Sequence, residues 1–330
     1  MTIEVTPKIT ICYRHPETET SLRCNRCNKY ICAKCAQRSP VGFRCPDCLV
    51  ELEDRFYSNV KDETLNPFDR ALAQPFFTYL LIAINLVVFA AMELQGGSTN
   101  DDVLIKFGAN YGPLMLWDNQ WWRLFTYMFL HIGVQHLVFN TIGLMAFGLE
   151  SERLYGQAKF ITIYLLTGLF GGLLSFAVRG PMTFSAGASG AIFGIIGMQL
   201  AFFAYYYYRL GDFSSQKVKS MFTLIGVSLV LGVSGIMPAD NWAHMGGLVS
   251  GVILGYLLAP RYAVDQTKSP RRIYDRASFV RRWWVSLLAI LLFMAGTWNM
   301  SNYWQNNFNN TKDLINDLRD LIENPPPSQP

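Results

Sequence analysis

The chain has 330 residues, of which 51% are hydrophobic, 14% aromatic and only 16% charged. Soluble globular domains carry about 25% charged residues, so this composition excludes an ordinary soluble protein. The formal net charge of +4 is small, and no basic patch interleaved with aromatic residues accompanies it. No nucleic-acid partner is therefore expected.

The first fifty residues carry a repeated metal-ligand spacing. Seven cysteines and one histidine form four pairs, and each pair has two residues between its members: Cys12 and His15, Cys24 and Cys27, Cys32 and Cys35, Cys45 and Cys48. Such a pair wraps one ion through a tight turn, and four ligands close a tetrahedral zinc shell with no position left for catalysis. Disulfides are the alternative, but an odd number of cysteines would leave one thiol unpaired. We predict a domain at 1–50 that holds two structural zinc ions.

The pairing of these ligands is suggested by their regular alternation. An interleaved arrangement would join the first pair to the third and the second pair to the fourth. This stretch resembles a B-box-type zinc finger, and the resemblance favours the interleaving. It implies a structural or docking domain, with a cytoplasmic protein as its partner.

Seven long apolar runs follow a charged linker at 51–75. About twenty apolar residues cross a bilayer, and the runs are near 76–93, 136–150, 160–178, 188–208, 220–237, 242–258 and 283–299. We therefore predict an all-α polytopic membrane protein. Its core at 76–260 holds six helices, a basic loop at 261–282 follows, and a seventh membrane helix occupies 283–300. The tail at 301–330 is expected to be disordered, with a short amphipathic helix from Asp313 to Glu323.

Orientation follows from the lysines and arginines, which are enriched in cytoplasmic loops. With the N-terminus inside, 23 of the 28 basic residues fall on inner segments. We expect an integral multi-pass protein of the plasma membrane with a cytoplasmic N-terminus and an external C-terminus. Residues 1–10 lack an apolar core, so no cleavable signal peptide is expected.

Polar residues recur at one depth near the predicted outer face. The outer loop before the second span contains Trp117, Trp121 and Trp122, as expected for a segment in the membrane interface. His136 and Asn140 then lie four residues apart, so they share one face of a helix. Donors placed in this way suit stabilisation of negative charge on a reacting oxygen. For His131, a structural role in the core is as plausible as a catalytic one.

A serine and a second histidine mark the fourth and sixth spans. Ser189 lies between Gly187 and Gly190 at the start of one span, and His244 lies at the start of the other. A nucleophilic group at membrane depth indicates a functional site. Gly-x3-Gly steps follow both residues and allow close helix approach. We therefore expect a hydrogen bond between Ser189 and His244, with the histidine as base.

These motifs resemble those of the rhomboid intramembrane serine proteases. The resemblance covers 76–258 and rests on Gly187-Ala188-Ser189-Gly190, on His131-x4-His136-x3-Asn140 and on Ala243-His244-x2-Gly247-x3-Gly251, with Trp122-Arg123 and Glu152 in addition. It implies a six-helix rhomboid-like core plus one C-terminal membrane helix.

The resemblance also implies roles for single residues. Ser189 would be the nucleophile and His244 the general base, with no aspartate in a triad. His136, Asn140 and the Ser189 amide would hold the oxyanion, and Phe193 would pack against the His244 ring. The substrates would be single-span membrane proteins cut near the outer face, and no cofactor would take part in catalysis.

Three other functions fit parts of the sequence. An inactive rhomboid relative would bind membrane proteins without cutting them, but such proteins typically lose the serine or the histidine. A transporter would spread polar residues along a path through the membrane rather than at one level. An adaptor built around the zinc domain would not need seven spans as an anchor.

Overall fold

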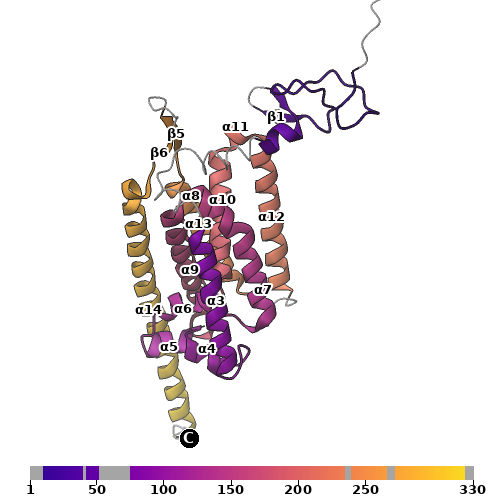
Figure 1. The fold of residues 1–330 in the computed structure, drawn as a ribbon. Helices are drawn as coiled ribbons and strands as arrows, with labels where there is room; N and C mark the ends of the chain where they lie inside the picture. Colours follow the sequence, from indigo (N-terminus) through magenta and orange to yellow (C-terminus); the bar gives the residue numbers. More distant parts are fainter. Residues whose placement is uncertain (1–9, 40–41, 52–74, 235–238, 266–271, 324–330) are drawn as a thin grey trace, which may run out of the picture.

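The computed structural model describes residues 10–39, 42–51, 75–234, 239–265 and 272–323. A bundle of roughly parallel and antiparallel helices forms the body, and a small module of the N-terminal residues lies at one end of it (Figure 1). We call this end the module end. The predicted linker at 51–75 lies almost entirely outside the described residues.

Short strands form three two-stranded antiparallel sheets. Their members are β1 (Gln37–Ser39) with β2 (Gly42–Arg44), β3 (Asn110–Tyr111) with β4 (Phe184–Ser185), and β5 (Tyr262–Asp265) with β6 (Arg272–Asp275). In the third sheet Tyr262 pairs with Asp275 and Asp265 with Arg272. The sheets are accessory, so the fold is essentially helical as expected.

Within the described residues, a helix lies in every predicted apolar run; positions 235–237 of the fifth run lie outside them. They are α3 (Phe76–Leu94), α4 (Asp101–Phe107), α5 (Gly112–Trp117), α6 (Arg123–Thr126), η1 (Tyr127–Phe129), α7 (Gly133–Gly143), η2 (Leu144–Gly148), α8 (Leu149–Tyr155), α9 (Gln157–Arg179), η3 (Gly180–Met182), α10 (Ser189–Tyr205), α11 (Tyr207–Leu210), α12 (Asp212–Val233), α13 (Asn241–Leu258) and α14 (Phe279–Glu323). Helices α7, η2 and α8 are continuous and include a π-helical stretch. The second apolar run is therefore part of a longer helix.

Three helices of the described chain are long and apolar enough to cross a membrane, and a bent pair raises the number to four. The three are α3, α9 with η3, and the first part of α14, while the pair joins 123–129 to 133–155 across a bend of 91°. Helix α10 is apolar but has 17 residues, which is short for a complete crossing. The predicted crossings at 188–208, 220–237 and 242–258 thus remain predictions.

Helices α10 and α13 form the centre of the bundle and approach each other closely. A Cβ atom at Gly247 would lie 1.9 Å from the carbonyl oxygen of Gly190, and one at Gly251 would lie 2.1 Å from that of Gly194. Real Cβ atoms do not come this close, so only glycine permits the contact. The Gly-x3-Gly steps therefore bring the two helices together in the way the sequence predicted.

Glu152 of α8 holds the first turn of α3. Its buried carboxylate accepts hydrogen bonds from the backbone N–H groups of Phe76, Phe77 and Thr78 at 2.8–2.9 Å, and from Thr78 Oγ1 at 2.7 Å. The first N–H groups of a helix lack partners within the helix, and they favour negative charge. Glu152 thus has a structural role, although its partners are 74 to 76 residues away in the sequence.

The segment between α3 and α7 is held by a buried arginine. Arg123 donates from Nη1 to the carbonyl oxygens of Ile105 and Ala109, and its side chain is buried. Trp121 packs edge-on against Phe176, whereas Trp122 is about half exposed. The expected aromatic segment is therefore folded against the bundle and not only laid on an interface.

One expectation for the C-terminal third needs correction. Helix α14 continues past residue 300 to Glu323, so residues 301–312 are helical where a disordered tail was expected, and they join the helix expected from Asp313 to Glu323. Residues 324–330 lie outside the described residues. Trp304 and Gln305 contact the bundle, the latter by donating to the carbonyl of Leu116. In the basic loop at 261–282, β5 and β6 form a hairpin.

Candidate active site

The serine and histidine predicted to meet do so. Ser189 is the first residue of α10, and His244 lies in the first turn of α13. His244 Nε2 is 2.8 Å from Ser189 Oγ. This distance is normal for a hydrogen bond between a hydroxyl and an imidazole. The close glycine contacts between α10 and α13 explain how side chains 55 positions apart come within reach.

The His244 ring is fixed by packing. Phe193, one helical turn after Ser189, stacks on it with ring centroids 4.2 Å apart and planes inclined by 6°. His244 is buried, and its Nδ1 has no hydrogen-bond partner among the described residues. In the neutral ring, Nε2 accepts a hydrogen bond from the serine hydroxyl and Nδ1 carries the ring hydrogen. A stacked aromatic ring therefore holds the imidazole orientation that a carboxylate supplies in a triad.

Asp240 fixes the start of α13, and sequence reasoning missed it. Its Oδ1 accepts from the N–H of Ala243 at 3.1 Å, which makes it the N-cap of the helix. Its Oδ2 accepts from Ser175 Oγ and lies 3.8 Å from Arg179 Nη1. The capping position, four residues before His244, was readable from the sequence, but its partners on α9 were not.

Two polar side chains of α7 face the segment before Ser189. His136 Nδ1 accepts from the N–H of Ile132 at 3.3 Å, so the ring hydrogen of the neutral form resides on Nε2. A Cβ atom at Gly187 would lie 2.8 Å from this Nε2 and 3.7 Å from Asn140 Nδ2. Gly187 has a φ of +135°, which favours glycine. Two N–H donors therefore lie next to the backbone just ahead of the serine.

His131 and Gly190, which flank the predicted site in the sequence motifs, have packing roles. His131 is fully buried, and its ring centroid lies 5.3 Å from that of His136. Neither nitrogen of His131 has a hydrogen-bond partner among the residues described. A Cβ atom at Gly190 would lie 3.3 Å from the carbonyl oxygen of Ala243, so this glycine allows the approach of α13.

The eight predicted metal ligands gather into two groups with the interleaved composition that the alternation suggested. One contains Cys12, His15, Cys32 and Cys35, and the other contains Cys24, Cys27, Cys45 and Cys48. In the first group, His15 Nδ1 lies 3.3–3.8 Å from the three sulfur atoms. Ligands on a tetrahedral zinc ion are about 3.5–3.8 Å apart, given Zn–S and Zn–N bonds of about 2.3 and 2.0 Å. The donor set therefore fits a metal ion.

In the second group, Cys27 Sγ and Cys45 Sγ are 3.6 Å apart. This separation also fits two thiolates on one ion, and it is well beyond the roughly 2.05 Å of a disulfide bond. All seven cysteines are free of disulfides. The module contacts the membrane bundle where the N–H of Arg38 donates to Asp212 at the start of α12.

The fold and site define a class: an integral membrane protein of several apolar helices with a buried serine–histidine pair at its centre. Residues 118–261 match the family model of the Rhomboid domain. The chain is 39% identical over 226 residues to Rhomboid protease GluP of Bacillus subtilis. This alignment covers 64% of this chain and 43% of that protein.

Eukaryotic relatives are also similar. Rhomboid-like protease 3 of Toxoplasma gondii is 35% identical over 171 residues, covering 52% of this chain and 64% of that protein. RHOMBOID-like protein 1 of Arabidopsis thaliana is 34% identical over 174 residues, covering 51% and 43%. The chain thus spans about half the length of the curated relatives it matches. These comparisons support the rhomboid family for the membrane-embedded part, and they include proteins named as proteases.

Proposed function

We propose that the protein is an intramembrane serine endopeptidase of the rhomboid type, and the 2.8 Å contact between Ser189 Oγ and His244 Nε2 carries the proposal. Ser189 Oγ attacks the carbonyl carbon of a substrate peptide bond while its proton passes to His244 Nε2. His244 then returns the proton to the leaving amine. The resulting ester on Ser189 is hydrolysed by water, which His244 activates in the same way.

The oxyanion formed in these steps needs donors. We assign this role to His136 Nε2, Asn140 Nδ2 and the backbone N–H of Ser189. The Ser189 amide is the first in α10, so it has no carbonyl partner within the helix and lies at the positive end of the helix dipole. Donors fixed before the reaction stabilise negative charge most effectively where water is scarce.

The proposed substrates are single-span membrane proteins, in line with what rhomboid proteins cleave. The excess of basic residues at the module end favours this end as cytoplasmic. Ser189 begins the 17-residue helix α10, whose other end is near the module. Cleavage would then occur on the outer side, with the C-terminus of the chain also outside and the plasma membrane as the location.

The two cysteine–histidine groups are proposed to hold one structural zinc ion each, in a B-box-like domain. Zinc bound there would cross-link the chain and stabilise a module too small for a large apolar core. With four protein ligands per ion, no open position is left for catalysis. A cytoplasmic protein is the proposed partner of the module's free surface.

Proteolysis can be tested with the full chain in liposomes and a single-span model substrate. Ser189→Ala and His244→Ala should each lower the cleavage rate on the order of 1000-fold or more. Ser250→Ala is a matched control on α13, because its hydroxyl bonds only to carbonyls of its own helix. Cleavage by Ser189→Ala at the rate of the control would refute the assignment. Substrate binding without cleavage by the unmodified protein would instead indicate the inactive relative.

A further inference from the structure

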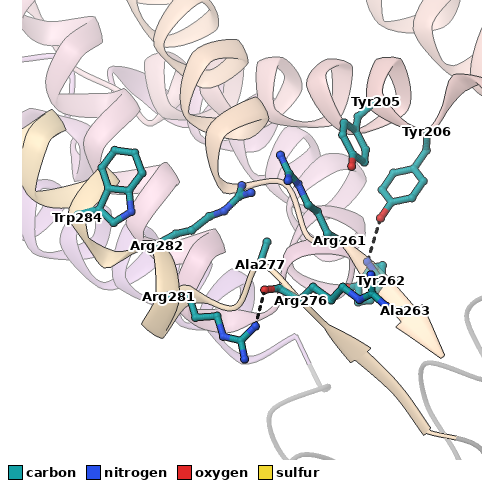
Figure 2. Close-up of a pocket in the computed structure, with 10 residues that line it drawn as sticks. All are labelled: Tyr205, Tyr206, Arg261, Tyr262, Ala263, Arg276, Ala277, Arg281, Arg282 and Trp284. Atoms are coloured by element: carbon teal, nitrogen blue, oxygen red, sulfur yellow. Dashed lines mark hydrogen bonds between the residues drawn. The ribbon is translucent and has the colours of Figure 1, made fainter. Parts of the chain in front are cut away.

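A large basic cavity lies at the module end, far from Ser189. Its volume is about 750 Å³, which is in the range of small-molecule sites. The walls come from the end of α10, the β5–β6 hairpin and the start of α14, and they include Arg261, Arg276, Arg281 and Arg282 (Figure 2). At about 1.5 Å per residue, the 17-residue α10 separates Ser189 from this cavity by roughly 24 Å. The cavity is therefore not part of the candidate active site.

The four guanidinium groups lie against neutral partners, and that of Arg261 lies 5.9 Å from the centroid of the Tyr205 ring. Arg281 donates to the carbonyl of Arg276 at 3.1 Å, and Arg282 donates to the carbonyl of Leu257. Arg276 Nε donates to Tyr274 Oη at 3.4 Å. Within the described part of the chain, no carboxylate forms an ion pair with any of the four. Their positive charge is thus available to a ligand.

Asp275, which precedes Arg276 in the sequence, already has partners for its carboxylate. Asp275 Oδ2 accepts from Lys159 Nζ at 2.6 Å, and its Oδ1 accepts from the N–H groups of Arg261 and Ala277 at 2.7–2.8 Å. This carboxylate therefore fixes the loop that presents the arginines instead of neutralising them. Tyr206 Oη supports the opposite wall by accepting from the N–H of Tyr262 (Figure 2).

The cavity is placed at the level of a membrane surface. Trp284 lines it, and Trp283 and Trp284 are both about half exposed. Tryptophans of membrane proteins gather at headgroup depth. Leu287, Leu288 and Leu291 follow along α14 and are also exposed, as expected of side chains that contact acyl chains. An occupant would thus meet arginines at one end and an apolar helix face next to them.

We infer that this cavity binds the headgroup of an anionic phospholipid. Planar guanidinium groups pair with phosphate oxygens through two parallel hydrogen bonds. A cluster of them favours a headgroup of net negative charge over a zwitterionic one, because the arginines repel the ammonium group of the zwitterion. The inference does not depend on the proposed proteolysis, because no residue of the cavity contributes to the Ser189 site.

Native mass spectrometry of the full chain, released from nanodiscs of mixed phosphatidylglycerol and phosphatidylcholine, tests this site. The expected result is one retained phosphatidylglycerol per chain. Each arginine near a lipid surface changes affinity about fivefold, so Arg276→Gln with Arg281→Gln should lower retention about 25-fold. Arg153→Gln with Lys219→Gln removes the same charge from exposed positions that do not line the cavity. This control should retain the lipid, and equal retention by both double variants would overturn the inference.

A second arm separates a lipid from a soluble phosphate compound. Glycerol 3-phosphate and inorganic phosphate are added to the same nanodiscs at millimolar concentration. Continued retention of phosphatidylglycerol supports a lipid site, since the acyl contacts on α14 add to the headgroup contacts. Complete displacement by either soluble anion would show that the cavity takes soluble phosphates, and the lipid assignment would fail. Unfolding of the two double variants at the same temperature checks that both are folded.

Discussion

Replacing Glu152 by glutamine should strongly destabilise the bundle. The carboxylate is buried and accepts four hydrogen bonds at 2.7–2.9 Å, three of them from the first N–H groups of α3. The amide of glutamine has one acceptor oxygen, which can serve Phe76 and Phe77. Its NH₂ group would then face the N–H of Thr78, while the Thr78 hydroxyl can turn and accept.

The magnitude follows from these contacts. Two bonds to Phe76 and Phe77 lose their charge assistance, which costs about 1 kcal/mol each, and one buried N–H of Thr78 becomes unsatisfied, which costs about 1–3 kcal/mol. We therefore expect Glu152→Gln to lower the free energy of unfolding by about 3–5 kcal/mol. The effect reaches α3, although the substituted residue lies on α8.

The assay is equilibrium unfolding in mixed micelles with a rising fraction of dodecyl sulfate. Glu150→Gln is the matched control, because Glu150 is on the same helix but pairs with the partly exposed Lys217 at 2.9 Å. Partly exposed ion pairs contribute about 1 kcal/mol or less. A loss of stability below 1 kcal/mol for Glu152→Gln, equal to that of the control, would refute the reasoning.

Three further predictions concern helix contact, ring packing and metal. Gly251→Ala should abolish cleavage of a model substrate, because the new Cβ atom would lie 2.1 Å from the carbonyl oxygen of Gly194 and separate α10 from α13. Gly226→Ala is the control and should leave the rate unchanged, since a Cβ atom at Gly226 would have no heavy atom within 4 Å. Phe193→Ala should lower the rate about fivefold, since loss of the stacking energy of roughly 1 kcal/mol frees the imidazole, and Phe193→Tyr should restore it. Metal analysis should find about two zinc ions per chain, and a chelator should make residues 10–51 sensitive to protease; a zinc content of zero would contradict the metal assignment.

Much of the fold could be predicted because membrane helices are local structures. Their backbone hydrogen bonds close within one segment, so a long apolar run by itself indicates a helix. The polar ends of helices were harder to predict. The asparagine and glutamine residues of α14 beyond residue 300 form no apolar run, so the sequence did not indicate a helix there. In the structure the helix continues to Glu323, and Trp304 contacts the bundle. The hairpin of β5 and β6 likewise depends on pairing across the loop.

The candidate site was predictable in its residues more than in its support. Ser189 and His244 stood out because polar groups at membrane depth are rare. The partners of Asp240 on α9 and the hydrogen bonds of Arg123 come from distant segments, and no local pattern indicates them. The basic cavity is a similar case, since a cluster of arginines in the sequence does not say that it surrounds a space.

The sequence by itself determined where the helices form, which ligands share a metal spacing and which side chains have reactive groups. These properties depend on residues close in the sequence and on the spacing at which residue types recur. Only the tertiary structure showed that His244 Nε2 lies 2.8 Å from Ser189 Oγ, that Glu152 caps α3 and that four arginines line one cavity. Such contacts join segments that are tens of residues apart in the sequence. They form only when the helices pack at the right distance, which depends on how closely their backbones can approach.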